Sequence, residues 1–295
     1  MSLVYKIKLK FRIKDRINNI ILLLSKNIII LFNNIYKKKI YNKINLKKPI
    51  LDIDKYKKIA NESKKITSSE INHFEETLGF KIDKNWIDNL ALRTTIEIKK
   101  SGINYSHGRI LYTSLRNYIK LNYGKLNHIN IIETGTARGF SSLCMAKALN
   151  DSNSSGTILT FDIVPNKISR FWNCIIDHEL GPTTRQELLE PYKELVNKYI
   201  IFLEGDTKIE LPKILIPRIN FAFIDGSHTY DDVMFEFNLI KDCQKEGDLI
   251  IFDDYNNILF PGIVKAVDEI CKNFYYDKKI IKSIYGNQYV ITTKI

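Results

Sequence analysis

Apolar runs that end in an acidic residue recur along the second half of the chain, and amphipathic stretches separate them. The runs are Ile131–Glu133, Ile158–Asp162, Tyr199–Asp206, Ile219–Asp225 and Asp248–Asp254. The stretches with helical character are Leu143–Leu149, Arg185–Lys198, Asp231–Lys245 and Gly262–Asn273. Nearly continuous apolar strands that alternate with helices predict a parallel sheet that is covered on both faces.

The last two apolar runs predict a different connection. Lys279–Ile284 and Gln288–Thr293 are separated only by the short turn Tyr285–Asn287. A turn of this length joins antiparallel strands in a hairpin. We therefore expect an α/β fold with a seven-stranded, mostly parallel sheet and one antiparallel strand.

The first run leads into the sequence E-T-G-T-A-R-G-F-S at Glu133–Ser141, which predicts a strand, a glycine-rich turn and a helix. The dinucleotide pattern G-x-G-x-x-G would need glycine at positions that hold Ala137 and Phe140. Since a pyrophosphate needs close backbone approach there, NAD and FAD are disfavoured. The turn suits a ligand without phosphates, such as S-adenosylmethionine. A tight turn that binds no ligand is the alternative.

Acidic residues at strand ends should meet at one edge of a parallel sheet. They are Glu133, Asp162, Asp225, Asp253 and Asp254. An acid placed like Asp162 can accept hydrogen bonds from both ribose hydroxyls of a nucleoside. Crowded carboxylates repel one another unless a cation lies among them, and a sulfonium cofactor or a divalent metal would meet that need. Alternatively, the pair Asp253-Asp254 simply opens a loop.

His228 is the candidate base. It lies three residues after Asp225, in the segment D-G-S-H-T-Y-D-D, at the start of a predicted helix. A neutral imidazole near an alcohol accepts a proton at neutral pH. A histidine that only orients its loop through a carboxylate is an equal alternative.

Several segments together resemble class I S-adenosylmethionine-dependent methyltransferases, in particular the macrocin O-methyltransferase type and related sugar O-methyltransferases. The matching segments are Glu133–Ser141, Phe161–Asp162, Ile224–His228, Gly247–Tyr255 and Pro261–Glu269. The resemblance covers roughly residues 125–295. It implies a Rossmann-like fold and methylation of a hydroxyl of a sugar, glycan or glycosylated metabolite, with S-adenosylmethionine as cofactor and Mg²⁺ or Mn²⁺ as metal.

The resemblance also implies roles for individual residues. The cofactor-binding set is Glu133, Gly135, Thr136, Gly139, Ser141, Asp162, Asp206 and Asp225, with Asp206 at the adenine edge. The implied metal ligands are Asp225, Asp253 and Asp254, and the implied catalytic residues are His228 and Asp225. The segment G-S-H-T-Y-D-D differs from the usual macrocin helix start. A different function on the same fold, either a metal-dependent hydroxylase-like enzyme or a non-catalytic partner in glycan assembly, is the alternative.

The net charge of +12 belongs to the N-terminal segment. Residues 1–50 hold 13 of the 45 Lys and Arg and one of the 33 acids, so residues 51–295 hold 32 of each sign. A nucleic-acid substrate calls for a basic face beside the site, so we expect no nucleic-acid partner. The basic, apolar residues 1–50 suit peripheral contact with the inner membrane face, packing on the domain or on a second subunit, or disorder.

We expect the chain to divide into an N-terminal appendage (residues 1–50), a helical region (51–125) and the methyltransferase domain (126–295). In the helical region, Tyr105, His107 and Arg109 either contact cofactor or acceptor, or are polar residues of a helix surface. Residues 168–191 are a candidate acceptor lid. The four cysteines are scattered. With no secretory signal, they indicate reduced thiols in a cytoplasmic protein.

Overall fold

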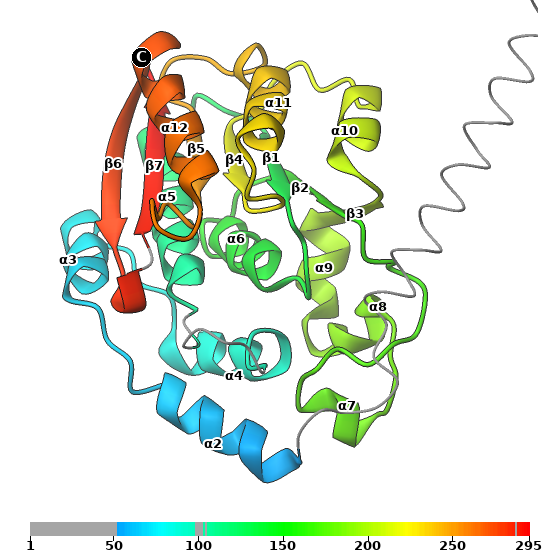
Figure 1. Cartoon of the computed structure of the whole chain (residues 1–295). Helices are drawn as coiled ribbons and strands as arrows, with labels where there is room; N and C mark the ends of the chain where they lie inside the picture. The colour runs from blue at the N-terminus through cyan, green and yellow to red at the C-terminus, as the bar shows by residue number, and fades with distance from the viewer. Residues whose placement is uncertain (1–51, 98–102, 104, 287) are drawn as a thin grey trace, which may run out of the picture. The chain divides into compact units, whose positions relative to one another are not determined.

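The computed structural model describes residues 52–97, 103, 105–286 and 288–295 (Figure 1). The predicted appendage, residues 1–50, lies outside the described residues. The α-helices are α2 (Ile53–Ser63), α3 (Ser69–Leu78), α4 (Lys84–Thr94), α5 (Ser106–Leu121), α6 (Phe140–Asp151), α7 (Ile176–Glu179), α8 (Arg185–Leu188), α9 (Lys193–Tyr199), α10 (Thr207–Glu210), α11 (Tyr230–Lys241) and α12 (Pro261–Asn273). The 3₁₀ helices are η1 (Glu190–Tyr192), η2 (Leu211–Lys213) and η3 (Ile284–Gly286). The strands are β1 (Ile129–Thr134), β2 (Gly156–Asp162), β3 (Ile200–Glu204), β4 (Phe221–Ile224), β5 (Leu249–Phe252), β6 (Tyr276–Lys282) and β7 (Gln288–Lys294).

The strands form one seven-stranded sheet in the order β3-β2-β1-β4-β5-β7-β6. β1 to β5 pair in parallel, whereas β7 is antiparallel to both of its neighbours, β5 and β6. This confirms the predicted α/β fold and its single antiparallel strand. The hairpin β6–β7 turns at η3, where the sequence predicts the turn.

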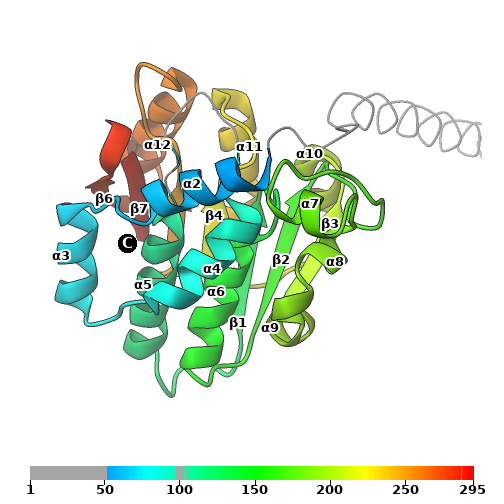
Figure 2. The ribbon, with the colours of Figure 1, turned by 90° about the horizontal axis from the view of Figure 1, so that it is seen from below.

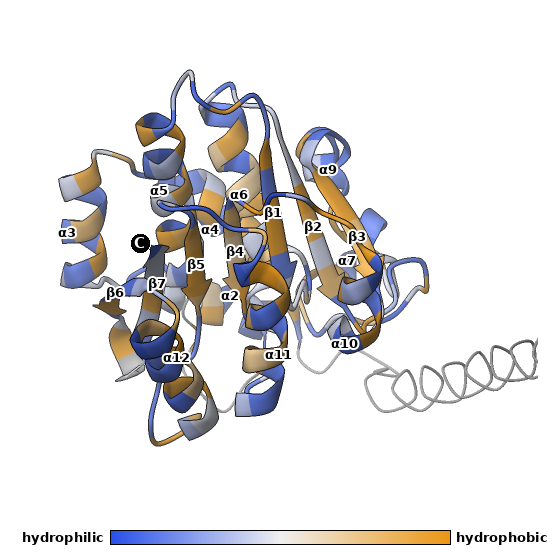
Figure 3. Cartoon of the chain, turned by 90° about the horizontal axis from the view of Figure 1, so that it is seen from above, coloured by the Kyte–Doolittle hydropathy of each residue, from blue (hydrophilic) through white to orange (hydrophobic). Residues whose placement is uncertain are grey.

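Both faces of the sheet are buried, as the apolar runs predict. Side chains alternate between the faces, so that Ile131 and Phe223 enter one core cluster while the adjacent Ile132 and Ile224 enter the other. α5, α6 and α9 contribute to the first cluster, and α11 and α12 contribute to the second. Figures 1 and 2 show the two helical layers, and Figure 3 shows apolar strands between helices that are polar on one side.

The N-terminal helices form an outer layer on the first face. α4 packs against α6, α2 packs against α4, and α3 packs against α5 and β6. The residue before each of these helices caps it, because its side chain accepts a backbone N–H of the first turn. The capping residues of α2, α3 and α4 are Asp52, Ser68 and Asp83. Each cap gives a hydrogen-bond acceptor to a backbone N–H of the first helical turn, which has no partner within the helix. The remaining stability of these short helices comes from packing.

The predicted helical stretch Arg185–Lys198 is divided into α8, η1 and α9. Pro191 lies in η1, near the middle of the stretch. Proline has no N–H to donate, and its ring collides with the preceding turn of an α-helix. The apolar periodicity of the stretch is real, but a continuous helix through Pro191 is not, and this part of the prediction is wrong.

Two features bear on the environment of the protein. All four cysteines are free, with Cys144 and Cys174 buried. Within the described ranges, no helix combines the length and apolar character that crossing a bilayer requires.

A buried carboxylate connects three elements beside the centre of the sheet. Glu236 of α11 is 1% exposed and accepts hydrogen bonds from Thr134 Oγ1 of β1 (2.9 Å) and Thr207 Oγ1 of α10 (2.7 Å). Burial raises the pKa of Glu236 to about 7, although the two threonine hydroxyls act in the opposite direction. The charged form of Glu236 is therefore costly to the folded protein.

The raised pKa of Glu236 predicts a pH dependence of stability. The folded state binds the proton more tightly than the unfolded state, so stability is full below about pH 4.5 and is lost as pH rises through about 7. Glu236→Gln removes this titration and should gain about 1–3 kcal/mol relative to the wild type at pH 8, with little gain at pH 5. Urea denaturation at both pH values measures this. Glu246→Gln, at an exposed position, is the control. A Glu236→Gln effect that does not change with pH would contradict the assignment.

Candidate active site

The carboxyl ends of β1, β2, β4 and β5 meet at one edge of the sheet because these strands are parallel. The strand order changes direction between β1 and β4. Open α/β sheets bind ligands at this switch point. The residues that follow β1 are the glycine turn (Gly135–Gly139), and those that follow β4 are the histidine loop (Asp225–Thr229). The two segments are therefore neighbours at the switch point.

Gly135 and Gly139 are required by the geometry of the glycine turn. Gly135 has φ +92°, and a Cβ there would lie 2.2 Å from the backbone oxygen of Asp225. Gly139 has φ +87°, and a Cβ there would lie 2.8 Å from Leu189 Cδ1. Only glycine permits both the backbone conformation and the close approach. Ala137, between them, also has a positive φ of 45°, a strained conformation of the kind found at ligand sites.

Glu133 lies beneath the turn and is fully buried. The hydroxyls of Ser141 and Ser142, at the start of α6, donate to its two carboxylate oxygens. Burial raises the pKa of Glu133, and the serine hydroxyls oppose that rise. The structure therefore places Glu133 and Ser141, both predicted to bind cofactor, in the support of the turn.

Asp162 and Thr136 connect the turn to β2. The Asp162 carboxylate accepts the N–H of Ala137 (2.5 Å) and of Val164 (2.7 Å), and its side chain is 10% exposed. Burial raises the pKa of Asp162, and the charge of Arg185 opposes that rise. Thr136 shares a hydroxyl hydrogen bond of 2.6 Å with Thr160. Asp162 is thus located at the turn, as predicted, and a carboxylate has acceptor sites beyond the two used here.

Arg185 is the residue that sequence reasoning missed. It is 1% exposed, and it donates to the carbonyls of Ala137 (3.0 Å) and Val164 (3.3 Å), with Nη2 3.6 Å from Asp162 Oδ2. It belongs to the predicted lid, residues 168–191. That lid is packed on the turn: Trp172 is buried, and its carbonyl accepts from Arg138 Nε (2.7 Å). An arginine in a polar loop carries no local signal that its side chain turns inward.

Asp206 follows β3, where the resemblance implies a contact with the adenine edge. Its carboxylate caps α10 by accepting the N–H of Lys208 (2.9 Å). β3 is the edge strand beside β2, so Asp206 lies beyond Asp162 along the same edge of the sheet. Its contact with adenine stays a prediction.

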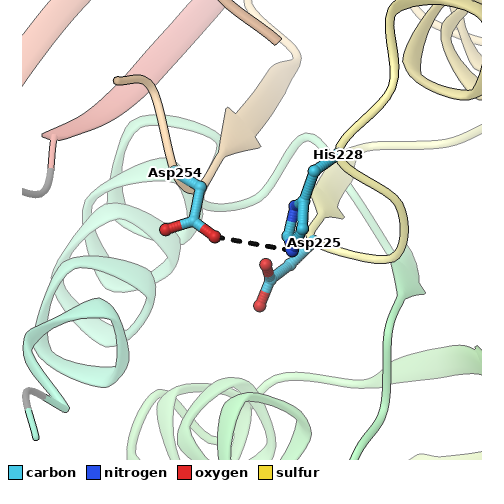
Figure 4. A group of neighbouring side chains, drawn as sticks. All are labelled: Asp225, His228 and Asp254. Atoms are coloured by element: carbon cyan, nitrogen blue, oxygen red, sulfur yellow. Dashed lines mark ion pairs between the residues drawn. The ribbon is translucent and has the colours of Figure 1, made fainter. Parts of the chain in front are cut away.

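Asp225, His228 and Asp254 form the group that Figure 4 shows. One potential ligand atom from each lies within 4.8 Å of the others. His228 Nε2 is 3.6 Å from Asp254 Oδ2, and the two side chains are 41% and 23% exposed. Asp254 has a φ of 55°, which is unfavourable for a residue with a Cβ. The arrangement can hold a divalent cation or orient an imidazole for proton transfer.

Asp253 lies outside that group. It is buried, and its Oδ1 accepts the N–H of Asp254 (2.6 Å). The group that the structure brings together is Asp225, His228 and Asp254, and a role of Asp253 as a metal ligand stays a prediction. Burial and the surrounding acids hold the pKa of Tyr289 well above its usual range.

Asp232 of α11 fastens the histidine loop. The hydroxyls of Ser227 and Thr229, on either side of His228, both donate to Asp232 Oδ2. Lys208 of α10 forms an ion pair with the other carboxylate oxygen. The His228 ring also packs against Phe260, with ring centroids 4.5 Å apart. The loop is thus held on both sides of the histidine.

The three residues proposed at the start of α5 have different surroundings. The ring of His107 packs against Phe140 (centroids 4.8 Å apart) and lies parallel to Phe223 of β4 (6.4 Å). Tyr105 donates to Asp88 (2.6 Å), whereas Arg109 forms an ion pair with Glu75. His107 thus contacts a residue of the sheet as well as one of the helix that follows the turn, and Tyr105 also contacts that helix, with its ring centroid 6.2 Å from that of Phe140.

Comparison with known proteins gives the class that the sequence predicts, a methyltransferase. Residues 132–255 match the model of a family described as a methyltransferase domain. The match runs from β1 to just beyond β5, so it contains the glycine turn, Asp162, the histidine loop and Asp254. This match to a methyltransferase domain confirms the predicted class.

Solved structures and a curated relative are also similar to this chain. The O-methyltransferase TomG from Streptomyces achromogenes, involved in tomaymycin synthesis and solved in complex with SAM, has a TM-score of 0.51 and 14% identity, over 75% of this chain and 94% of TomG. A cofactor-bound protein from MTB has a TM-score of 0.50 and 14% identity, over 72% of this chain and 90% of its own. An uncharacterized protein of Acanthamoeba polyphaga mimivirus is 40% identical over 53 residues, 18% of this chain. The match spans 24% of that relative's length. At 14% identity the structural likeness shows the fold alone, which is Rossmann-like as predicted; the macrocin type stays a prediction.

The buried position of Arg185 predicts a large loss of stability when its charge is removed. Arg185→Met leaves the buried Asp162 without its cation and two carbonyls without donors. We expect the free energy of unfolding to fall by about 3–5 kcal/mol in urea denaturation.

Arg116→Met is the matched control, because Arg116 is 21% exposed and lies 3.9 Å from Asp151. Its loss should stay below about 1 kcal/mol. Equal losses in the two variants would show that Arg185 has no special role in the turn.

Proposed function

We propose that this chain transfers a methyl group from S-adenosylmethionine to a hydroxyl oxygen. One observation carries the proposal: within a methyltransferase domain, the glycine turn and the group of Asp225, His228 and Asp254 are neighbours at the switch point of the sheet. A cofactor on the turn and an acceptor at the group would therefore meet. Methyl transfer needs little more than this, because the sulfonium of the bound cofactor already activates the methyl carbon.

The residues of the turn fit this cofactor. Gly135 keeps the turn close to Asp225, and Gly139 keeps it close to Leu189. Ala137 occupies the position at which the dinucleotide pattern has the glycine that lets a pyrophosphate approach the backbone. Asp162 is held by two backbone N–H groups and keeps acceptor sites for the ribose hydroxyls. A buried carboxylate held in this way discriminates strongly in favour of a ligand that donates hydrogen bonds to it.

Asp225 and Asp254 are the carboxylates that would hold a divalent cation. Mg²⁺ is commonly bound by one or two carboxylates, with the remaining positions left to water or substrate oxygens, and Mn²⁺ accepts the same ligands. When bound, the cation would supply charge that orients a hydroxyl and lowers its pKa. The strained φ of Asp254 supports a role for this residue in binding rather than in folding.

His228 is the proposed base. Its side chain is 41% exposed, and Asp254, 3.6 Å away, can hold the ring in one orientation. Asp232 fixes the loop around it. His228 would accept the proton of the acceptor hydroxyl as the oxygen attacks. The ligand atoms of Asp225, His228 and Asp254 lie within 4.8 Å of one another, which favours a second role for His228 as a metal ligand. A ring nitrogen that binds a metal cannot also accept a proton.

The acceptor we propose is a hydroxyl of a sugar, a glycan or a glycosylated metabolite, because of the resemblance to the macrocin type. A nucleic acid is not proposed. Residues 51–295 carry basic and acidic side chains in equal number, so this part of the chain has no net positive charge with which to bind a nucleic acid. Mass spectrometry of products formed from nucleotide sugars and glycan extracts identifies the acceptor.

Cofactor binding tests the function directly. The wild type should bind S-adenosylmethionine in calorimetry, and Asp162→Ala should weaken binding by about 1–3 kcal/mol, or roughly 5- to 150-fold, because ribose hydroxyls lose their acceptor. Asp277→Ala, at an exposed position of the opposite edge strand β6, should bind like the wild type. Binding of NADH in preference to S-adenosylmethionine would overturn the proposed function.

The role of His228 can be separated from that of the metal. If His228 is the base, His228→Ala should lower turnover by about 10²–10⁴-fold and leave Mn²⁺ affinity nearly unchanged.

His73→Ala, at an exposed position of α3, is the control for a His→Ala change and should alter neither turnover nor Mn²⁺ affinity. Weakened Mn²⁺ binding by His228→Ala would assign His228 to the metal instead. Turnover within a few-fold of the wild type would leave His228 as a residue that orients its loop.

A further inference from the structure

A cavity of about 200 Å³ lies among the N-terminal helices α2, α3, α4 and α5. Part of its lining is apolar and comes from Ile66, Ile82 and Ile87. The remainder is polar and includes Tyr105 and Ser106 from the start of α5. Neither the glycine turn nor the histidine loop contributes to it, so the cavity is separate from the candidate active site.

The charge of this cavity is unbalanced. Its basic lining residues are Lys64, Lys81, Lys84 and Arg109, and its acidic lining residue is Asp88. Two of the four cations are neutralised by the protein: Lys84 lies 3.1 Å from Asp88, and Arg109 lies 2.5 Å from Glu75. Counting both acids, the cavity keeps an excess of positive charge.

That excess resides on Lys64 and Lys81. Among the residues that the structure describes, neither lysine has an ion-pair partner, and they approach the cavity from different connections, Lys64 after α2 and Lys81 after α3. Two like charges at one cavity repel each other unless an anion lies between them. Lys64 is half-buried whereas Lys81 is exposed. An ammonium in a partly enclosed place, such as that of Lys64, interacts more strongly with an anion than one in bulk water.

The lining is fixed independently of any ligand. Lys84 Nζ donates to the backbone oxygen of Lys64 (3.2 Å), which ties the start of α4 to the end of α2. Tyr105 donates to Asp88 (2.6 Å), which ties the start of α5 to α4. Arg109 donates to both Glu75 and Asn72 of α3. A cavity that is already formed loses little free energy in ordering its walls on binding.

We propose that this cavity binds a compact organic anion, whose carboxylate or phosphate lies between Lys64 and Lys81 and whose apolar part lies on Ile66, Ile82 and Ile87. The size of the cavity suits a molecule of one ring or a short chain. The shared requirement is a negative group on a small apolar body, whether it comes from a free metabolite or from part of a larger one.

Calorimetry on the full chain at low salt tests the proposal with three probes. Inorganic phosphate and benzoate carry the two anionic groups, and benzyl alcohol is a neutral probe of the size of benzoate. We expect saturable binding of phosphate or benzoate, and none of benzyl alcohol. Lys64→Ala with Lys81→Ala should weaken that binding by about 100-fold, since two charge-assisted contacts are lost.

Lys57→Ala with Lys58→Ala removes the same charge at exposed positions of α2 and should change binding less than about twofold. Unchanged S-adenosylmethionine binding and melting temperature show that the variants are folded. If the double variant of Lys64 and Lys81 does not fold, the single variant Lys81→Ala takes its place in the experiment. Equal weakening by both pairs of substitutions, equal binding of benzyl alcohol, or no binding of either anion would overturn the proposal.

Discussion

The backbone of Gly135 lies so close to the carbonyl of Asp225 that no side chain fits between them. This contact joins the segment after β1 to the segment after β4, at the place where the order of the parallel strands changes direction. The glycine turn and the histidine loop are therefore placed together by the sheet itself. Replacing Gly135 by any other residue would separate the two segments and with them the proposed cofactor and acceptor positions.

Two kinds of acidic residue lie at this edge of the sheet, and burial distinguishes them. Glu133 and Asp162 are enclosed and held by hydroxyls, backbone N–H groups and the buried Arg185, so that their charges are compensated within the protein. Asp225 and Asp254 are only partly buried, and they face an exposed imidazole. The enclosed acids organise the turn, whereas the partly exposed ones lie where a cation would be held. The same residue type thus serves the fold in one place and the proposed chemistry in the other.

The strands and their acidic ends could be predicted because burial on both faces leaves nearly continuous apolar runs, which need no knowledge of neighbours to detect. The same argument located the turn, Asp162 and the histidine loop at one edge. It failed where a side chain's direction mattered. Asp253 and Asp254 are the same residue type, yet the first accepts the backbone N–H of Asp254 and the second faces His228. Arg185 looked like part of a polar lid, and Pro191 divided a stretch whose periodicity suggested one helix.

The sequence by itself determined the fold class, the order of its elements and the edge of the sheet at which the candidate residues meet, because hydrophobic periodicity and turn composition are local properties. Only the tertiary structure decided which side chains share a site. Side-chain direction depends on the backbone conformation at single residues, such as the positive φ of Asp254, and on partners far away in the chain. Lys64 and Lys81 illustrate this: two surface lysines in sequence become the walls of one cavity because four helices pack around it.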